Sequence, residues 1–240
     1  MHVISSLFNL LLGGALVEAR NHQRALTNGV VAAYFDVDDT LTHTGTLESF
    51  LEHSMQGHRA PRLDEVGELR DFASQSNDLE EIHQRFAALY AGIPWSYLLE
   101  SGRRWAETFL PTQLDERMLE ILREHHRTGV RSVLVSGSWL PCLGPIARYL
   151  GVSRVMCSQP VVEHLNFAGR FESVMTGTQK AEAVLQDARA YQIDLNMSFA
   201  YGDHDSDFAM LSTVGNPTMV RPSAGLLSAG AKQSWALIPG

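Results

Sequence analysis

The sequence predicts an α/β protein: a doubly wound parallel sheet, with a helical insertion after the first strand and a small β-hairpin later on. Three observations predict this class. Apolar, β-leaning runs alternate with helical segments from Arg131 onward, as in a parallel sheet covered on both faces. Residues 44–128 carry helical spacing and no strand-like run. Acidic, hydroxyl and lysine side chains follow the strand ends, where open parallel sheets bind ligands.

Residues 1–29 are expected to form an N-terminal helical segment. The apolar run from Val3 to Val17 lacks a basic region before it and spans about 15 residues, whereas a membrane span needs about 20. We therefore expect a packed helix, with contact at a membrane surface as the alternative. Cys142 and Cys157 lie in apolar surroundings without metal-ligand spacing, so we expect free thiols and a cytoplasmic protein.

Residues 30–43 and 129–240 are expected to form the α/β core, and 44–128 a helical cap. The run from Val30 to Phe35 is the first strand, buried on both faces and ending at a group of acids. Three proline residues are expected to separate the cap helices: Pro61, Pro94 and Pro111. The apolar positions at helical spacing are Leu47, Phe50 and Leu51, then Leu79, Ile82, Phe86 and Leu89, then Leu98, Trp105 and Phe109.

The second half of the chain returns to alternating strands and helices. Strands are expected at 132–135, 153–157, 197–201, 218–220 and 235–238, and helices at 139–150, 178–191 and 205–212. The segment from Pro160 to Phe171 interrupts this order and predicts a β-hairpin that turns at Asn166 to Gly169. Asp205 is expected to cap the short helix that follows it.

The amino-acid composition limits the classes of molecule that the chain is expected to bind. The chain has 240 residues, of which 45% are hydrophobic and 19% charged, as in an ordinary globular protein. Its 19 basic and 27 acidic residues give a net charge of −8, which disfavours nucleic acid as a partner. The ten histidines show no zinc-binding spacing. A small phosphorylated metabolite is the expected partner, and the chain is expected to be a monomer or homodimer.

Polar groups suited to phosphate chemistry follow four of the predicted elements. They are Asp36 and Asp38 after the first strand, Ser136 and Gly137 after the second, Lys180 at a helix start, and Asp203 and Asp207 after a later strand. If the backbone turns after the first strand, one carboxylate can attack phosphorus while the other acts as general acid and then base. A lysine and a hydroxyl beside backbone N–H groups suit phosphate oxygens.

Four carboxylates at one site repel each other unless a cation lies among them. Oxygen ligands favour a hard ion, and Mg²⁺ is the natural candidate because it bridges carboxylate and phosphate oxygens. The sequence therefore predicts a magnesium site formed by Asp36, Asp38, Asp203 and Asp207.

Taken in order, these motifs resemble those of the haloacid dehalogenase superfamily. The motifs are Phe35-Asp36-Val37-Asp38-Asp39-Thr40-Leu41, Val135-Ser136-Gly137-Ser138, Lys180, and Gly202-Asp203-His204-Asp205-Ser206-Asp207. The layout is similar to the subgroup that contains phosphoserine phosphatase, with a Rossmann-like core and a helical C1 cap. Asp39 departs from the commoner glycine or serine at its position.

The resemblance implies a role for each motif residue. Asp36 would form an aspartyl-phosphate, and Asp38 would protonate the leaving group and then activate water. Magnesium would be held by the Asp36 carboxylate, the Asp38 main-chain carbonyl and the Asp203 carboxylate, with Asp207 supporting them. Ser136, with Gly137, and Lys180 would bind the phosphoryl group.

The substrate is less clear from the sequence. Phosphoserine phosphatases bind the amino acid through an acid and an arginine of the cap, and the candidates here, Glu48 and Arg85, lack the expected spacing. Trp139 directly follows the predicted phosphate-binding loop, Ser136-Gly137-Ser138, and is a further candidate for substrate contact. The apolar cap suggests a bulkier or more hydrophobic alcohol as leaving group, such as a lipid or a secondary metabolite.

Three functions compete at this stage. The leading one is a phosphomonoesterase, because Asp38 argues against a dehalogenase. A second is an enzyme resembling class II terpene cyclases or processing prenyl diphosphates, since Asp36 to Asp39 also matches a DxDD acid motif. The third is a non-catalytic regulatory protein that retains the fold.

Overall fold

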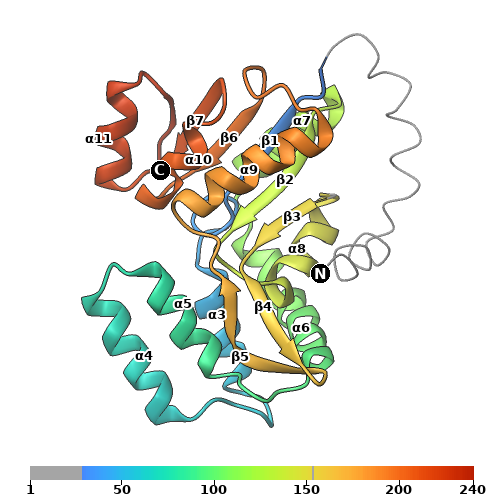
Figure 1. Ribbon diagram of the computed structural model, residues 1–240, viewed down its shortest axis with the longest axis vertical. Helices are drawn as coiled ribbons and strands as arrows, with labels where there is room; N and C mark the ends of the chain where they lie inside the picture. The colour runs from blue at the N-terminus through green and yellow to red at the C-terminus, as the bar shows by residue number, and fades with distance from the viewer. Residues whose placement is uncertain (1–28, 153) are drawn as a thin grey trace.

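A six-stranded parallel sheet forms the centre of the protein (Figure 1). The computed structural model describes residues 29–152 and 154–240, so the helix expected within 1–29 lies outside the described residues, apart from residue 29. The strand order is β3-β2-β1-β6-β7-β8, which confirms the predicted fold class. The strands of this sheet are β1 Ala32–Phe35, β2 Arg131–Ser136, β3 Arg154–Cys157, β6 Phe199–Gly202, β7 Asn216–Val220 and β8 Ala236–Ile238.

The helices lie in two groups. In the predicted insertion they are α3 Thr46–Ser54, α4 Leu63–Gln75, α5 Leu79–Ala88, α6 Trp95–Gln113 and α7 Glu116–Thr128. After β2 they are α8 Leu140–Leu150, α9 Thr178–Tyr191, the 3₁₀ turn η1 Asp205–Asp207, α10 Phe208–Leu211 and α11 Ala224–Lys232.

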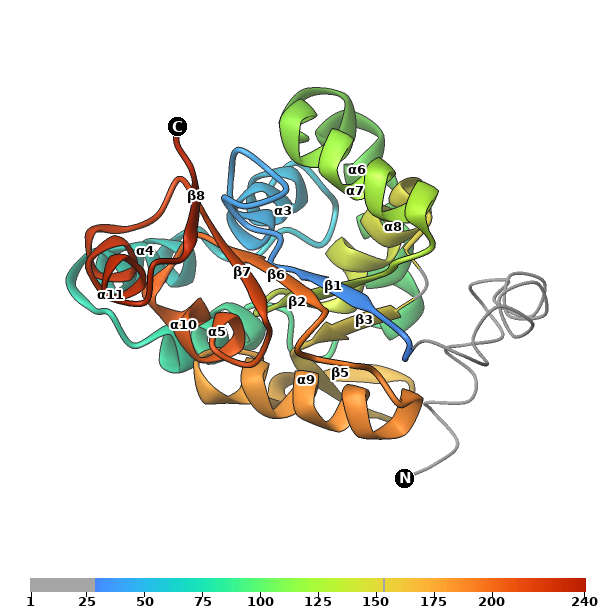
Figure 2. The same cartoon turned by 90° about the horizontal axis from the view of Figure 1, so that it is seen from above.

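Strand β1 shows why the sheet is covered on both faces. All four of its residues have no exposed surface, and their side chains alternate between two hydrophobic clusters. Ala33 and Phe35 join the cluster that includes α7 and α8, whereas Ala32 and Tyr34 join the cluster that includes α9, α10 and α11. The view from above shows α9 and α10 on the side of the sheet opposite α7 and α8 (Figure 2).

The last helix of the predicted insertion packs against the sheet. On α7, Met118 and Leu122 are buried in the same cluster as Leu134 of β2. His125 Nε2 lies 2.8 Å from the Tyr201 hydroxyl of β6. We therefore propose that the cap ends before α7, earlier than residue 128.

The hairpin β4 Gln159–Glu163 and β5 Asn166–Ser173 turns two residues earlier than predicted. His164 and Leu165 have φ values of 48° and 67°, and Asn166 pairs with Glu163, so the expected turn at 166–169 is wrong. Gly169 lies within β5 with φ of 76°, a left-handed conformation that favours glycine. A methyl group built there would also lie 2.6 Å from Cβ of Ala91, three residues beyond the end of α5.

Two further helical details differ from the prediction. Pro111 lies inside the last turn of α6 and does not separate helices: it removes the one bond that its own N–H would donate, and α6 continues to Gln113. Helix α11 was not predicted, since its small-residue sequence lacks apolar periodicity; its N-terminus is capped by the Ser223 hydroxyl, which accepts from Leu226 N at 3.3 Å.

Within the described part of the chain, no helix combines the length and apolarity needed to cross a bilayer. Both cysteines, Cys142 and Cys157, are buried and unbonded to each other, as expected.

Candidate active site

The site lies at the carboxyl edge of the sheet, around its central strand β1. Asp36 follows β1, Ser136 ends β2, and Asp203 follows β6. Because β2 and β6 flank β1 in parallel, their ends deliver these three side chains to one edge. The strand order reverses at β1, because β2 and β3 lie on one side of it and β6, β7 and β8 on the other. Ligands usually bind at such a point in an open α/β sheet.

A tight turn follows Asp36, as the spacing of the two acids requires. The Val37 carbonyl accepts from the backbone N–H groups of Thr40, Leu41 and Thr42, at 3.3, 2.9 and 3.0 Å. The turn passes through Asp39 with φ of 56°, a left-handed conformation that aspartate tolerates better than most residues. The replacement of glycine or serine by aspartate here is therefore compatible with the turn.

The Asp38 carboxylate is held by both the cap and the core. Its Oδ1 accepts from Thr46 N, at the start of α3, at 2.6 Å. Its Oδ2 lies 3.5 Å from Ser136 Oγ. Burial raises the pKa of Asp38, while the Thr46 N–H lowers it, and burial is the larger cause. Asp38 thus keeps its proton to a higher pH than an exposed aspartate does.

Lys180 is a buried cation between two carboxylates. Its Nζ donates to Asp36 Oδ1 at 2.5 Å and to Asp207 Oδ1 at 2.6 Å. Burial by itself lowers the pKa of Lys180, but the Asp207 and Asp36 carboxylates raise it on balance above its ordinary value. The lysine remains charged at any physiological pH.

Asp207 is fully engaged within the protein. Its Oδ2 accepts from Asp203 N and His204 N, both at 3.1 Å, while its Oδ1 binds Lys180. A methyl group on Gly202 would lie 2.7 Å from Cβ of Asp207, so the glycine permits this close packing. The expected capping role of Asp205 is wrong, because its carboxylate accepts from the Ser223 hydroxyl at 2.5 Å and His204 caps the turn instead.

The acidic cluster fits a hard cation. Asp36, Asp203 and Asp207 each place one carboxylate oxygen within 4.8 Å of the others. Burial and then the charge of Asp207 raise the pKa of Asp203 to about 7, and burial, opposed by Lys180, raises that of Asp36. One lysine does not offset so much buried negative charge, and the all-oxygen donor set is the kind that Mg²⁺ prefers. The Asp38 side chain lies outside this set of three.

The loop from Ser136 to Trp139 is held by hydrogen bonds within itself and to α3. Ser136 Oγ accepts from Ser138 N at 3.0 Å, and Thr46 Oγ1 donates to Ser138 Oγ at 2.7 Å. Gly137 lies under the cap, because a methyl group built on it would be 2.6 Å from Cε1 of His83 on α5. The loop is therefore tied to α3 and covered by α5.

The three residues suggested for substrate contact do not join the cluster. Trp139 has no exposed surface and packs against aromatic rings of the cap and hairpin, such as Phe50 and Phe167, so its contact with substrate stays a prediction that this packing does not favour. Arg85 is exposed and pairs with Glu81 at 2.8 Å. Glu48 is exposed and makes no hydrogen bond or ion pair with any described residue of the cluster.

Sequence reasoning considered histidines only as zinc ligands, and so it missed His83. The signal was present in the helical spacing of α5, since His83 lies between Ile82 and Phe86, which were both expected to face inward. A histidine in such a row points toward the interior with its neighbours.

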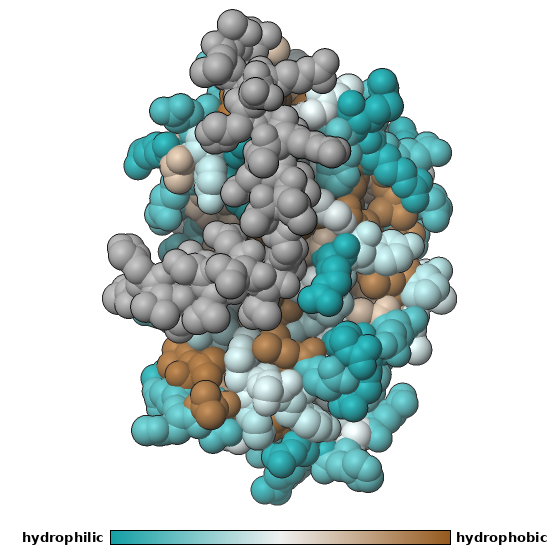
Figure 3. Space-filling view, turned by 90° about the vertical axis from the view of Figure 1, so that its right-hand side faces the viewer, coloured by the Kyte–Doolittle hydropathy of each residue, from teal (hydrophilic) through white to brown (hydrophobic). Residues whose placement is uncertain are grey.

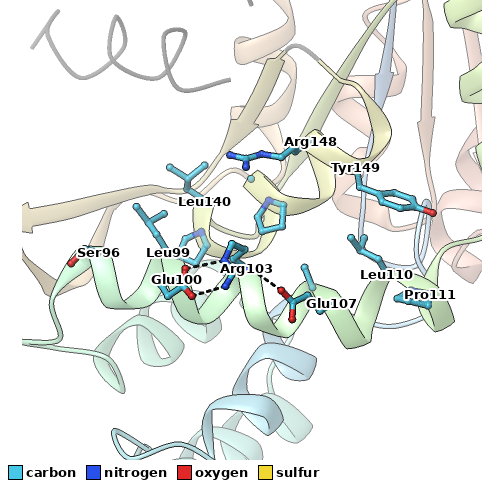
Figure 4. A pocket seen from close by; sticks show the side chains of 14 residues that line it. Ser96, Leu99, Glu100, Arg103, Glu107, Leu110, Pro111, Leu140, Arg148 and Tyr149 are labelled. Carbon is cyan, nitrogen blue, oxygen red and sulfur yellow. Dashed lines mark hydrogen bonds and ion pairs between the residues drawn. The ribbon is translucent and has the colours of Figure 1, made fainter. Parts of the chain in front are cut away.

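A groove lies apart from these residues. This groove of about 710 Å³ lies between α6 and α8, lined by residues such as Leu99, Leu140 and Tyr149, and none of the candidate site residues lines it (Figure 4). Its ion pairs, from Arg103 to Glu100 and Glu107, stay within α6. Figure 3 shows the molecule from the right-hand side of Figure 1. Where described residues are visible in that view, hydrophobic patches are separated by hydrophilic residues.

Comparisons with known proteins converge on one family. A family model of haloacid dehalogenase-like hydrolases matches residues 33–212. The inhibition of morphological differentiation protein of Streptomyces azureus is 27% identical over 214 residues, which are 86% of this chain and 77% of that protein. Phosphoserine phosphatase SerB1 of Mycobacterium tuberculosis is 26% identical over 216 residues, 86% of this chain and 70% of that protein.

The fold also matches solved structures. A protein of unknown function from Bordetella pertussis Tohama I superposes with a TM-score of 0.79 at 22% identity, over 88% of this chain and 99% of that chain. At this identity the likeness concerns the fold alone.

Proposed function

The chain belongs to the haloacid dehalogenase-like hydrolase family, and on this basis we propose that it is a magnesium-dependent phosphatase that hydrolyses a phosphate monoester of a small metabolite through an aspartyl-phosphate. The family resemblance expected from the four motifs is confirmed. The name of the Mycobacterium tuberculosis relative, phosphoserine phosphatase, supports phosphate esters as the substrate class.

One observation carries the proposal: a second aspartate is held in place two residues after the first. Asp38 is fixed through Thr46 N at 2.6 Å, beside the loop that carries Ser136. Its raised pKa suits a group that must hold a proton and then donate it. A dehalogenase of this superfamily places no acid at that position.

The reaction then follows in two steps. A carboxylate oxygen of Asp36 attacks phosphorus, the bond from phosphorus to the ester oxygen breaks, and Asp38 donates its proton to that oxygen. Asp38 next accepts a proton from water, whose oxygen attacks phosphorus and releases Asp36. Throughout, Lys180, the Ser136 hydroxyl and the Gly137 N–H would bind the phosphoryl oxygens.

A magnesium ion would be held by the carboxylates of Asp36 and Asp203 and by the Asp38 carbonyl. Asp207 would hold Lys180 and the backbone of Asp203 in place, since both of its oxygens already have partners. When bound, the ion supplies positive charge that reduces repulsion between the phosphate and the attacking carboxylate.

The apolar cap gives less guidance on the substrate than its sequence suggested. The cap residues Phe50, Tyr90 and Trp105 are buried, and Phe50 and Tyr90 pack against Trp139 of the core, so these rings form a core and do not line a binding surface. We therefore propose that the substrate is a small phosphorylated metabolite, which need not be hydrophobic.

The competing functions find no support. Asp36 follows a strand of a parallel sheet, whereas class II terpene cyclases are all-helical. The residues proposed for catalysis and phosphate binding, such as Asp36, Asp38 and Lys180, lie together at one edge of the sheet, which gives no reason to infer a non-catalytic protein.

The test is phosphate release from para-nitrophenyl phosphate and a panel of metabolite phosphates, with Mg²⁺ and after chelation. We expect turnover that chelation abolishes and Mg²⁺ restores, and that Asp36→Asn lowers by at least about 10³-fold. Asp71→Asn is the matched control, because Asp71 is exposed on α4. Turnover unchanged in Asp36→Asn would refute the mechanism.

A further inference from the structure

Helix α5 of the cap brings a histidine onto the phosphate loop. A methyl group built on Gly137 would lie 2.6 Å from Cε1, 3.3 Å from Nδ1 and 3.5 Å from Nε2 of His83. The imidazole edge therefore lies against the loop backbone. These ring atoms are the nearest to that methyl position outside the neighbouring residues, and Gly137 is one of the residues proposed to bind the phosphoryl group.

One polar atom of this ring has no partner. His83 Nδ1 is buried, and no described residue of the protein forms a hydrogen bond with it. A buried polar atom left without a partner costs about 1–3 kcal/mol. Such an atom beside a candidate site is explained most simply by a ligand group that completes its hydrogen bonding.

The helix that carries His83 is tied to the hairpin by the next residue in the sequence. Gln84 Nε2 donates to the Phe171 carbonyl and Gln84 Oε1 accepts from Phe171 N, both at 3.0 Å, which ties α5 to strand β5. The two elements run side by side (Figure 1). At the other end of the helix, Asp78 caps Glu81 N at 3.0 Å. The helix therefore presents His83 from a rigid support.

The ring is neutral at physiological pH. Burial and then the charge of Lys180 lower the pKa of His83 to about 4. A neutral imidazole does not add charge to the phosphoryl site, but it can donate or accept a hydrogen bond with an alcohol or amine.

Reaction geometry places the leaving group on the cap side. Attacking and leaving oxygens lie roughly in line through phosphorus, and the attacking oxygen belongs to Asp36 at the end of β1. The ester oxygen must therefore point away from the sheet edge. The phosphoryl oxygens have Lys180, Ser136 and Gly137 as partners, so the free imidazole atom is left for the alcohol.

We propose that His83 Nδ1 binds a hydroxyl or amino group of the leaving alcohol, so that the enzyme selects phosphate esters of polyols or amino alcohols over esters without such a group. The proposal rests on the proposed phosphatase function. It makes His83 a specificity-determining residue.

Two substitutions separate the ring nitrogens. In His83→Asn the amide occupies the position of Nδ1, whereas in His83→Gln it reaches toward that of Nε2. The substrates are glycerol 2-phosphate and O-phosphoethanolamine, which carry a polar group near the ester, and para-nitrophenyl phosphate, which does not. Melting temperatures show that each variant is folded, and inhibition by orthovanadate reports the phosphoryl site alone.

We expect His83→Gln to lower kcat/KM about tenfold for at least one of the two polar esters, chiefly through KM, because one hydrogen bond is lost. His83→Asn should stay within about threefold of the native protein, and para-nitrophenyl phosphate and orthovanadate should be unaffected by either change.

Equal losses for all three esters, or no loss for the polar ones, would overturn the assignment of Nδ1 to the leaving alcohol. If the native protein releases no phosphate from any ester with Mg²⁺, the phosphatase function itself fails and this proposal with it, which is a result distinct from the other two.

Discussion

The sheet edge and the cap hold their polar groups in opposite ways. At the sheet edge, Lys180 is bonded to two carboxylates, and both oxygens of Asp207 have partners. In the cap, His83 presents a buried nitrogen with no partner among the described residues. The polar groups at the sheet edge therefore find their partners within the protein and need only a cation. The His83 nitrogen in the cap needs a partner that we propose the substrate supplies.

This difference separates the chemistry of the molecule from its selectivity. The paired groups at the edge are suited to any phosphate ester, because they address only phosphorus, its oxygens and the metal. The unpaired nitrogen addresses whatever is attached to the phosphate. Substitution of Lys180 should therefore affect all substrates alike. Substitution of Asp38, which protonates the leaving oxygen, should depend on how readily that oxygen leaves, and substitution of His83 on the polar groups of the alcohol.

Among the substitutions that compare the edge with the cap, the largest combined effect on stability and activity is expected from Lys180→Met. It leaves Asp36 and Asp207 buried and facing each other without their cation, so we expect a loss of about 3–5 kcal/mol in the free energy of unfolding of the metal-free protein. Activity should fall by at least about 10²-fold on every ester, since a charge on the phosphoryl oxygens is lost. Urea unfolding and steady-state kinetics measure the two effects, and an ester-dependent loss would contradict the division between edge and cap.

A smaller loss is expected from Asp38→Asn. Without the proton donor, esters of alkyl alcohols should be hydrolysed about 10²-fold more slowly. The nitrophenyl ester should lose less, because its leaving group needs little protonation. The ratio of kcat values for alkyl and nitrophenyl esters measures this, and equal losses would remove Asp38 from the role of acid.

The smallest effect is a difference between the native protein and His83→Asn in how the free energy of unfolding depends on pH. The pKa of His83 is lowered from 6.5 to about 4, so between these values the unfolded chain binds more protons than the native protein. The contribution of His83 to stability is complete above about pH 6.5 and is lost as pH falls toward 4, by at most about 3 kcal/mol. His83→Asn should lose less stability on acidification in urea titrations, and parallel curves for both proteins would argue against a buried neutral imidazole.

The predictable parts of the molecule are those whose signal is local. Helix α9 was expected at 178–191 and lies there. Its start after Gly177 and its length can be predicted from consecutive residues alone. The motif residues were found because parallel strands deliver their C-terminal residues to one edge, whatever the rest of the chain does. Both inferences use short stretches of sequence.

The parts that were missed depend on contacts between distant segments. Gly169 suggested a hairpin turn, but it serves the close approach of Ala91, which no local pattern reveals. Trp139 follows the phosphate loop in sequence, yet rings from the cap and hairpin enclose it completely. His83 meets Gly137 across 54 residues of chain, a pairing that requires the fold of the whole cap.

The most direct test of the account is to identify the residue that carries the phosphoryl group. The native protein would be mixed with a good ester substrate and Mg²⁺, quenched in acid within one turnover and treated with borohydride, which reduces an acyl phosphate to an alcohol. We predict homoserine in place of aspartate at position 36 alone. Homoserine at another position, or phosphate release with no reducible intermediate at any quench time, would contradict Asp36 as the nucleophile.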